Sequence, residues 1–395
     1  MQFVLITSSN FPVGGAGANY LNLFCKGLKL NGDKIKVLLL KGFNFGDFNT
    51  TYKKHNLTVD GVPFSYLGFV SRPKNRFSRI FDEMLSFLNV HVQLVSMLPQ
   101  RKSTTLLIYN NEFHSNIVIY LFAKLFGIRI VTFVPEYYGK YIFEGSFLRR
   151  MKWYGFLFNF SFINKLSNKL IVFSYYLKEQ YLKKGFPEKD IIVQPNVTDF
   201  DYWEIKDAKI NYVLGYSGSP SIKDGLHDLF KAVSALKKDG VKISLIVVGD
   251  TPHGSSLLPG LKQECEKLDI ADNVFFSGLV ELAEVKKLLS ECRILTLTRQ
   301  FTVQSQAGFP TKLGEYFASR KKVLVTNFGD IEKYFTDGKD LVIAESGNIA
   351  DIAKKIRWML ENDADAELIA RAGYERAKQL LEYKSSIRRI SQLIR

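Results

Sequence analysis

The stretch "YVLGYSGSPSIKDGLHDLFKA" (Tyr212–Ala232) decides the fold, because it runs from an apolar strand through a glycine turn into a helix. The expected helix covers Leu226–Lys237, where apolar residues recur at helical spacing. Five further apolar runs alternate with helical stretches: Ile243–Asp250, Asn273–Gly278, Ile294–Thr298, Lys321–Asn327 and Asp340–Glu345. Continuous apolar strands separated by helices are typical of a parallel sheet covered on both faces. The second half of the chain is therefore predicted to be a doubly wound α/β domain.

The first half repeats this pattern. Gln2–Thr7 is predicted to be a buried strand, and a glycine-rich turn follows it before a helix over Asn19–Leu30. The later expected strands are Lys34–Leu40, Thr105–Asn110, Ile128–Val134, Lys169–Ser174 and Asp190–Asn196. We predict an N-terminal domain at 1–200, a polar linker at 201–211 and a C-terminal domain at 212–375. A final helix at 376–395 is expected to pack back on the N-terminal domain.

Composition sets limits on the class of protein. The chain has 395 residues, of which 46% are hydrophobic and 24% charged, as in an ordinary protein of two globular domains. Its three cysteines, Cys25, Cys265 and Cys292, are too far apart for a disulfide framework or a paired metal motif, so a reducing cytoplasm is expected. The apolar runs Ile117–Ala123 and Tyr154–Ile163 are shorter than a membrane span.

The positive charge is unevenly distributed. Residues 1–200 hold 25 Lys and Arg against 12 Asp and Glu, whereas the remainder holds 29 against 27. This asymmetry favours an anionic partner for the first half, namely lipid headgroups, a phosphorylated substrate or nucleic acid, although a basic surface without a specific partner explains it too. The chain has no recognisable nucleic-acid recognition motif, so we expect no nucleic-acid partner.

Two glycine turns are candidates for binding phosphate. Ligands of doubly wound sheets bind beyond the carboxyl ends of the strands, so the expected site is a cleft between the two domains. Gly15 and Gly17 follow the first strand and can bring bare backbone N–H groups to an anion, although a tight turn explains them equally well. Lys223, in the equivalent turn of the second domain, suits a diphosphate; an ordinary loop lysine is the alternative.

The stretch "GFPTKLGEYFA" (Gly308–Ala318) leads from a glycine-proline turn into a helix. The unpartnered N–H groups at such a helix start, together with the charge of Lys312, favour a diphosphate there. Glu315 would repel that diphosphate and is better suited to accept hydrogen bonds from a ribose diol. The alternative is a glutamate that stabilises its own helix dipole.

These motifs together resemble the retaining glycosyltransferases of the GT-B fold, specifically family four. The resemblance covers essentially the whole chain and is strongest from Tyr212 to Asp330, where "GYSGSPSIKDGLHDLFKA", "LIVVGD", "VFFSGLV", "ILTLTRQ" and "GFPTKLGEYFASRKKVLVTNFGD" occur in the family's order. "VFSYYLKEQYLKKGFPEKDIIVQPNVTDFDYW" (Val172–Trp203) is similar to the segment that closes the acceptor domain. The resemblance implies two Rossmann-like domains that face each other across a cleft.

The resemblance also implies roles for individual residues. Lys223 matches the phosphate-binding lysine, Glu315 the ribose-binding glutamate, and the backbone around Leu279 the loop that binds the base. The donor's phosphate and sugar would contact Phe309, Pro310, Thr311 and Lys312. The donor would be a UDP- or GDP-sugar. No metal and no other cofactor is expected, because lysine, helix dipole and amides neutralise the leaving diphosphate.

The sequence departs from the family pattern at three places, and these departures affect the roles that the resemblance implies. Ala307, with Gln306 beside it, stands where many members have a first glutamate that contacts the donor sugar. Ser219 stands where the family commonly has an arginine after the glycine turn. Lys223 also lies one position earlier, relative to Gly225, than in the commonest pattern. We expect Lys312 or Arg299 to supply the missing positive charge.

The third departure concerns catalysis, because the histidine that members often place after the strand Ile128–Val134 is absent. Glu136 occupies that vicinity and is a candidate to orient the acceptor or assist proton removal, with an ordinary loop acid as an equal alternative. His114 is a second candidate for lining the cleft, although a structural role is favoured for it.

The segment "KYIFEGSFLRRMKWYGFLFNFSFINKLSNK" (Lys140–Lys169) interleaves aromatic and basic residues. It suits either the boundary of an anionic bilayer or a core helix pair with a basic outer face. We expect a saccharide or polyprenyl-diphosphate-linked acceptor, and an enzyme of bacterial surface polysaccharide or glycolipid synthesis at the inner face of the plasma membrane. A nucleotide-sugar 2-epimerase of the same fold and a non-catalytic partner subunit are the alternatives.

Overall fold

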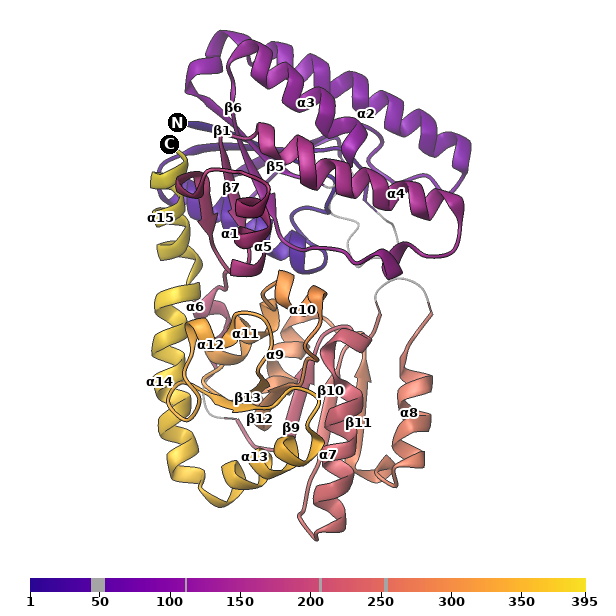
Figure 1. Cartoon of the computed structure of the whole chain (residues 1–395), viewed down its shortest axis with the longest axis vertical. Helices are drawn as coiled ribbons and strands as arrows, with labels where there is room; N and C mark the ends of the chain where they lie inside the picture. The colour runs from indigo at the N-terminus through magenta and orange to yellow at the C-terminus, as the bar shows by residue number, and fades with distance from the viewer. Residues whose placement is uncertain (44–53, 111, 206–207, 252–254) are drawn as a thin grey trace. The chain divides into compact units, whose positions relative to one another are not determined.

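The computed structural model describes residues 1–395 except 44–53, 111, 206–207 and 252–254 (Figure 1). The chain divides into two compact units. The first unit comprises Met1–Val197 together with Tyr383–Arg395, and the second comprises Thr198–Glu382. The segment predicted as a linker at 201–211 begins within helix α6 (Phe200–Trp203), which is part of the second unit.

The first unit is built on an eight-stranded sheet in the order β3-β4-β2-β1-β5-β6-β7-β8. All neighbouring strands are parallel except β3 and β4. The central strand β1 places Phe3 beside Ile35 on one side and Thr105 on the other. The strands are β1 (Gln2–Thr7), β2 (Lys34–Leu39), β3 (Asn56–Val59), β4 (Val62–Tyr66), β5 (Thr104–Tyr109), β6 (Arg129–Val134), β7 (Lys169–Val172) and β8 (Ile191–Val193).

The helices of the first unit cover this sheet (Figure 1). They are α1 (Ala16–Leu30), α2 (Arg76–Ser96), α3 (Phe113–Phe126), α4 (Phe147–Phe158), α5 (Tyr175–Lys183) and α15 (Tyr383–Ile394), with short segments η2 (Leu98–Ser103), η3 (Lys140–Phe143), η4 (Asn159–Ile163), η5 (Asn164–Leu166) and η6 (Glu188–Asp190). The C-terminal helix α15 packs on α1, where Gly27 makes room for it: a Cβ at Gly27 would lie 2.6 Å from the Cβ of Ile387. This helix therefore completes the core of the first unit.

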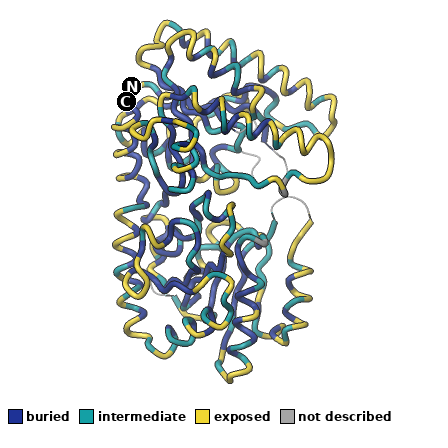
Figure 2. Tube along the Cα trace, in the orientation of Figure 1, coloured by how far each residue is buried: buried dark blue, intermediate teal, exposed yellow. Residues whose placement is uncertain are grey.

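The second unit has a six-stranded, fully parallel sheet in the order β11-β10-β9-β12-β13-β14. Its strands are β9 (Tyr212–Ser217), β10 (Leu245–Val248), β11 (Val274–Gly278), β12 (Cys292–Leu297), β13 (Lys322–Thr326) and β14 (Val342–Ala344). Its helical segments, besides α6, are η7 (Ile222–Asp224), α7 (Leu226–Lys238), α8 (Leu258–Lys267), η8 (Ala271–Asn273), α9 (Leu282–Ser290), α10 (Val303–Ala307), α11 (Thr311–Ala318), α12 (Ile331–Tyr334), α13 (Ile349–Glu361) and α14 (Asp363–Leu381). In both units the central strands are buried, while the edge strand β3 and the outer helix faces are partly or fully exposed (Figure 2).

The prediction of two doubly wound α/β domains is confirmed by these two sheets. The antiparallel hairpin β3–β4 and the long helix α2 were not predicted from the sequence. Asp60 and Gly61 form the hairpin turn with φ of 50° and 70°, the left-handed values that a tight two-residue hairpin requires. Among the described residues, no helix combines the length and the apolar character needed to cross a membrane.

Candidate functional site

The carboxyl edge of the sheet in the second unit is formed by closely packed backbone. Strand β9 ends at Ser217 and is followed by Gly218, whose φ is 117°. A Cβ at Gly218 would lie 2.2 Å from the Cε of Lys312, and a Cβ at Gly249 would lie 2.8 Å from the Gly218 carbonyl oxygen. Glycine at both positions therefore lets the strand ends and the Lys312 side chain lie close together.

A buried carboxylate organises the charged groups at this edge. Asp224, at the end of η7, accepts hydrogen bonds from Lys312 Nζ at 2.6 Å and from Arg299 Nε at 2.8 Å. Tyr216 also donates its hydroxyl to Asp224 at 2.8 Å and accepts a 2.7 Å hydrogen bond from Lys312. We call Tyr216, Asp224, Arg299 and Lys312 the Asp224 cluster. With two cations and one anion, it carries a net positive charge.

Burial and neighbouring charges set the protonation of this cluster. Burial alone would raise the pKa of Asp224, but Lys312 and Arg299 lower that pKa below its ordinary value. Burial lowers the pKa of Lys312 to about 8. The negative charge of Asp224 acts to raise this pKa, and the positive charge of Arg299 acts to lower it. Near neutral pH the carboxylate is therefore ionised and the ammonium mostly protonated.

Glu315 lies one helical turn after Lys312 on α11 and has a different environment. Its side chain is half-buried, and no donor among the described residues hydrogen-bonds to its carboxylate. Burial raises the pKa of Glu315 to about 7, against the opposing charge of Lys312. The carboxylate is thus available to accept hydrogen bonds from a ligand, and such bonds would favour its ionised form.

The other predicted donor-binding residues of the second unit follow strands β9, β11 and β12 of the same sheet. Lys223 is half-buried next to Asp224, and its charge contributes to lowering the pKa of Lys312. The Ser219 carbonyl oxygen lies 2.8 Å from the Tyr216 hydroxyl and shares its single proton with Asp224. Gln306 is half-buried on α10, whereas Leu279, after β11, is exposed.

The segment that leads into α11 packs into the protein interior. Phe309 and Pro310 are buried, and the Phe309 ring packs edge-on against Tyr334. Thr311 begins the helix directly after Pro310, which has extended backbone and makes no side-chain cap. Ala307 is fully buried, so the position where a first glutamate was expected faces the protein interior. Of the four residues from Phe309 to Lys312, Lys312 is the one whose side chain joins the Asp224 cluster.

The predicted residues of the first unit lie at the carboxyl edge of its own sheet. Gly15 is the N-cap of α1, and a Cβ there would meet no atom within 4 Å. A Cβ at Gly17 would lie 2.9 Å from the hydroxyl of Tyr109, at the end of β5. Glu136 follows β6, and its charge adds to the effect of burial in raising the pKa of Tyr109 and Tyr138. Gly17, Tyr109 and Glu136 therefore share one neighbourhood.

His114 belongs to a separate group of charges in this unit. Its Nε2 lies 3.8 Å from the Glu112 carboxylate, and burial lowers its pKa. Glu112 also pairs with Lys41, which follows β2 and whose pKa burial lowers to about 8. Neither this ion pair nor the roles of Tyr216 and Asp224 were predicted from the sequence. In the part of the chain that the structure describes, no three His, Cys, Asp or Glu side chains gather to hold a metal ion.

Comparison with known proteins places this geometry in context. Residues 200–376 match the family model described as glycosyl transferases group 1, a range that lies within the second unit. No curated protein matches the sequence. Among solved structures, HepE of Anabaena in complex with UDP has 17% sequence identity and a TM-score of 0.72, with 99% of each chain covered.

Two further structures have the same fold. Sucrose-phosphate synthase from Thermosynechococcus elongatus is 14% identical with a TM-score of 0.77, and the match covers 99% of this chain and 98% of that one. A TarM mutant of S. aureus, solved with fondaparinux, alpha-GlcNAc-glycerol and UDP, is 13% identical with a TM-score of 0.68 and full coverage of both chains. The chain therefore has the GT-B fold of glycosyltransferases, with two Rossmann-like domains.

Proposed function

We propose that the protein is a glycosyltransferase that moves a sugar from a nucleoside diphosphate sugar to a hydroxyl group of a saccharide or lipid-linked saccharide. The observation that carries the proposal is the Asp224 cluster, a fixed group of cations at the carboxyl edge of a parallel sheet. This is the edge where doubly wound sheets bind ligands. The cluster also lies in the domain that matches the glycosyl transferases group 1 family model.

The donor diphosphate would bind against Lys312 and Lys223, beside the first turn of α11. Lys312 is already held by Asp224 and Tyr216, so little side-chain entropy would be lost when the diphosphate binds. Fixed cations favour a reaction in which negative charge develops on the departing diphosphate. We propose that these side chains do this work without a metal ion.

Glu315 would bind the ribose of the same nucleotide. Two adjacent ribose hydroxyls can donate to one carboxylate, and Glu315 has no competing donor among the described residues. Because its pKa is about 7, ribose binding would favour loss of its proton. Nucleotide affinity would accordingly increase as the pH rises through 7.

We propose that the donor nucleotide is UDP, with GDP as the second candidate. HepE has been solved with UDP, with UDP and glucose, and with UDP-glucose, and the TarM mutant with UDP and saccharides. These structures share the fold of the chain at low identity and motivate the choice of donor to test first. The base would lie near Leu279 and the donor sugar near Phe309, Thr311 and Gln306.

The acceptor is proposed to bind the first unit, where Glu136 would orient its hydroxyl. The acceptor oxygen would form a bond to the anomeric carbon on the face from which the diphosphate leaves. The bond between that carbon and the diphosphate oxygen would break, and the diphosphate would take the hydroxyl proton. The anomeric configuration would thus be retained. We place this reaction at the cytoplasmic face of a bacterial membrane, in the synthesis of surface polysaccharide or glycolipid.

A thermal-shift series with UDP, UDP-glucose, GDP and GDP-sugars tests the proposal. A ligand that binds only the folded state raises the melting temperature, so at least one nucleotide should do so at submillimolar concentration. If none of them shifts the melting temperature, the proposal fails. Conversion of the donor sugar in the absence of any acceptor would instead identify an epimerase of the same fold.

A further inference from the structure

Helix α2 of the first unit has most of its apolar residues on the outside. Phe77, Phe81, Met84 and Leu88 recur at helical spacing and are 59–79% exposed. The buried face of the same helix consists of Asp82, Ser86, Val90 and Leu94, so half of its residues are polar. A surface helix normally buries its apolar stripe, and an exposed apolar stripe of this kind is typical of a surface that binds a partner or a membrane.

The exposed apolar surface continues over the neighbouring helices. Helix α3 contacts both α2 and α4, and the three lie side by side in Figure 1. Leu125 on α3 and Phe147, Leu148 and Met151 on α4 are all exposed. We call this surface, formed by α2, α3 and α4, the outer apolar face; Figure 2 shows the exposed positions along these helices.

The charges beside the outer apolar face are mostly positive. Helix α4 carries Arg149, Arg150 and Lys152, all exposed, and has no acidic residue from Phe147 to Phe158. Each Lys or Arg near an anionic membrane surface contributes on the order of 1 kcal/mol to binding. Two copies of the chain that met through this face would bring these cations toward each other. An anionic bilayer is therefore a better match than a second copy.

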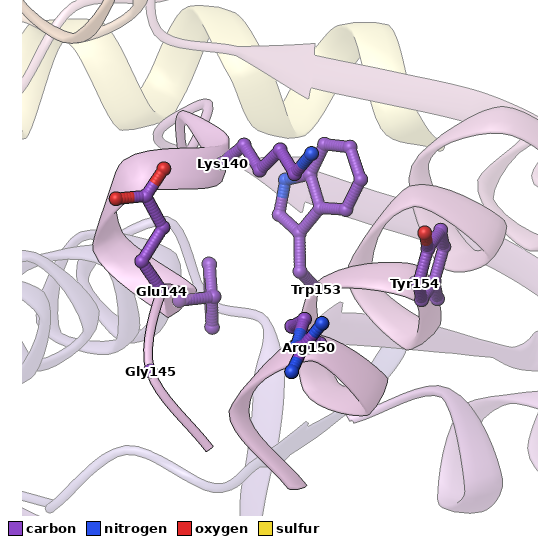
Figure 3. Close-up of a pocket in the computed structure, with 7 residues that line it drawn as sticks. Lys140, Glu144, Gly145, Arg150, Trp153 and Tyr154 are labelled. Carbon is purple, nitrogen blue, oxygen red and sulfur yellow. The ribbon is translucent and has the colours of Figure 1, made fainter. Parts of the chain in front are cut away.

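A hollow of about 350 Å³ lies at the exposed end of α4, between this helix and η3. Lys140, Arg150 and Trp153 line it, and Lys140 Nζ lies 6.0 Å from the centre of the Trp153 ring. The indole N–H of Trp153 is buried and has no hydrogen-bond partner among the described residues. Figure 3 shows Lys140 across the indole, with Glu144 on the opposite wall. With Lys140 and Arg150 against the one carboxylate of Glu144, the lining of the hollow has a net positive charge, which suits a phosphate group.

We infer that the outer apolar face docks on an anionic phospholipid bilayer, with one lipid phosphate bound in the hollow between η3 and α4. Acyl chains would contact the apolar residues of α2 and α4, and the phosphate would contact Lys140 and Arg150. The inference rests on the proposed function in one respect, because a lipid-linked acceptor requires its enzyme at a bilayer. Membrane binding is nevertheless measurable without any transferase assay.

Flotation with vesicles tests the docking surface. The full chain should float with vesicles of phosphatidylcholine and phosphatidylglycerol and bind vesicles of phosphatidylcholine alone at least about tenfold more weakly, since several cations lie at the surface. The double variant Phe77→Ser/Leu88→Ser should lose about tenfold or more in affinity, because two exposed apolar side chains no longer enter the bilayer. The matched control is Leu368→Ser, an equally exposed leucine on α14 of the second unit, which should bind like the wild type.

The hollow is tested by substitutions that leave the apolar residues intact. Lys140→Ala/Arg150→Ala should weaken binding to anionic vesicles more than Arg371→Ala, which removes an exposed cation on α14. Unchanged melting temperatures would show that the variants are folded. Wild-type protein that stays out of the floating fraction overturns the inference. So does a dimer, measured by light scattering, that the Phe77→Ser/Leu88→Ser change dissociates. Neither result bears on nucleotide binding, so the proposed function stands or falls separately.

Discussion

Lys312 and Asp224, which are 88 positions apart in the chain, meet in a 2.6 Å ion pair above the carboxyl end of β9. Arg299 holds the other carboxylate oxygen, so a single buried aspartate positions two cations. The lysine proposed to bind the donor is thus fixed before any ligand arrives. This preorganisation is the physical basis of the predictions that follow.

Asp224→Asn should destabilise the protein strongly, because it leaves Lys312 and Arg299 buried without their counter-ion. Removing one partner of a buried pair typically costs about 3–5 kcal/mol. Urea unfolding at pH 7 measures this free energy. Asp228→Asn is the matched control, since Asp228 is also buried on the same side of the turn but accepts from the neutral Gln300 amide at 3.1 Å. Equal losses for the two variants would argue against a special role for Asp224.

Glu315→Gln should stabilise the protein at alkaline pH while weakening nucleotide binding. The folded-state pKa of Glu315 is about 7, above its ordinary value of 4.5, so the neutral form is favoured in the folded state. The stability that this contributes is fully present below pH 4.5 and is lost as the pH rises through 7. Glutamine does not ionise, so the variant does not lose this stability. Its free energy of unfolding should exceed that of the wild type by about 1–3 kcal/mol at pH 8 and by nearly nothing at pH 4.5. Melting curves at the two pH values measure it, and a gain independent of pH would contradict the burial argument.

Gly225→Ala should be far more damaging than Gly240→Ala. Both glycines have similar left-handed φ values, 71° and 77°, so the backbone strain of a side chain is matched, at about 1–2 kcal/mol. A Cβ at Gly225 would lie 1.7 Å from the Thr298 carbonyl oxygen, whereas one at Gly240 would meet no atom within 4 Å. The excess loss in free energy of unfolding therefore measures the close packing beside Asp224. If the two variants unfold alike, that packing is looser than described.

Ile387→Ala on α15 should destabilise the first unit by about 2–5 kcal/mol, the usual cost of removing a fully buried isoleucine side chain. The C-terminal helix packs on α1 through this residue, opposite Gly27. Leu393→Ala on the same helix, at a position that is 48% exposed, should cost less than about 0.5 kcal/mol. Chemical unfolding of both variants measures these losses. An unchanged free energy of unfolding for Ile387→Ala would contradict the packing of α15 described here.

The strand-turn-helix repeats were predictable from sequence because their signals are local. A buried parallel strand such as Tyr212–Ser217 is apolar throughout and is followed directly by its glycine turn. Helix α2 was missed because its apolar stripe faces outward and its buried face includes Asp82 and Ser86, which is not the pattern of a core helix. The short hairpin β3–β4 had a usable signal in Asp60-Gly61.

The candidate site was only partly predictable. Lys312 and Glu315 were identified because they stand at the start of a helix after a glycine-proline turn, a pattern visible in a few residues. Asp224 was missed because its role depends on Arg299 and Lys312, which are distant in sequence and approach it only in the folded sheet. The segment around α4 was left with two interpretations. The structure divides its aromatic residues, burying Phe156 and Phe160 and exposing Phe147 and Phe162.

The most direct test of the central claim is a calorimetric titration of UDP into the wild type, Lys312→Met and Lys231→Met at pH 7, where Lys312 is mostly protonated. Lys231 is an exposed lysine on α7 and serves as the control for loss of a positive charge. We predict that the wild type and Lys231→Met bind UDP with the same affinity. Lys312→Met should bind at least about tenfold more weakly, as expected when a charged hydrogen-bond partner is lost. Equal UDP affinity for all three proteins, or no binding by the wild type, would contradict the account.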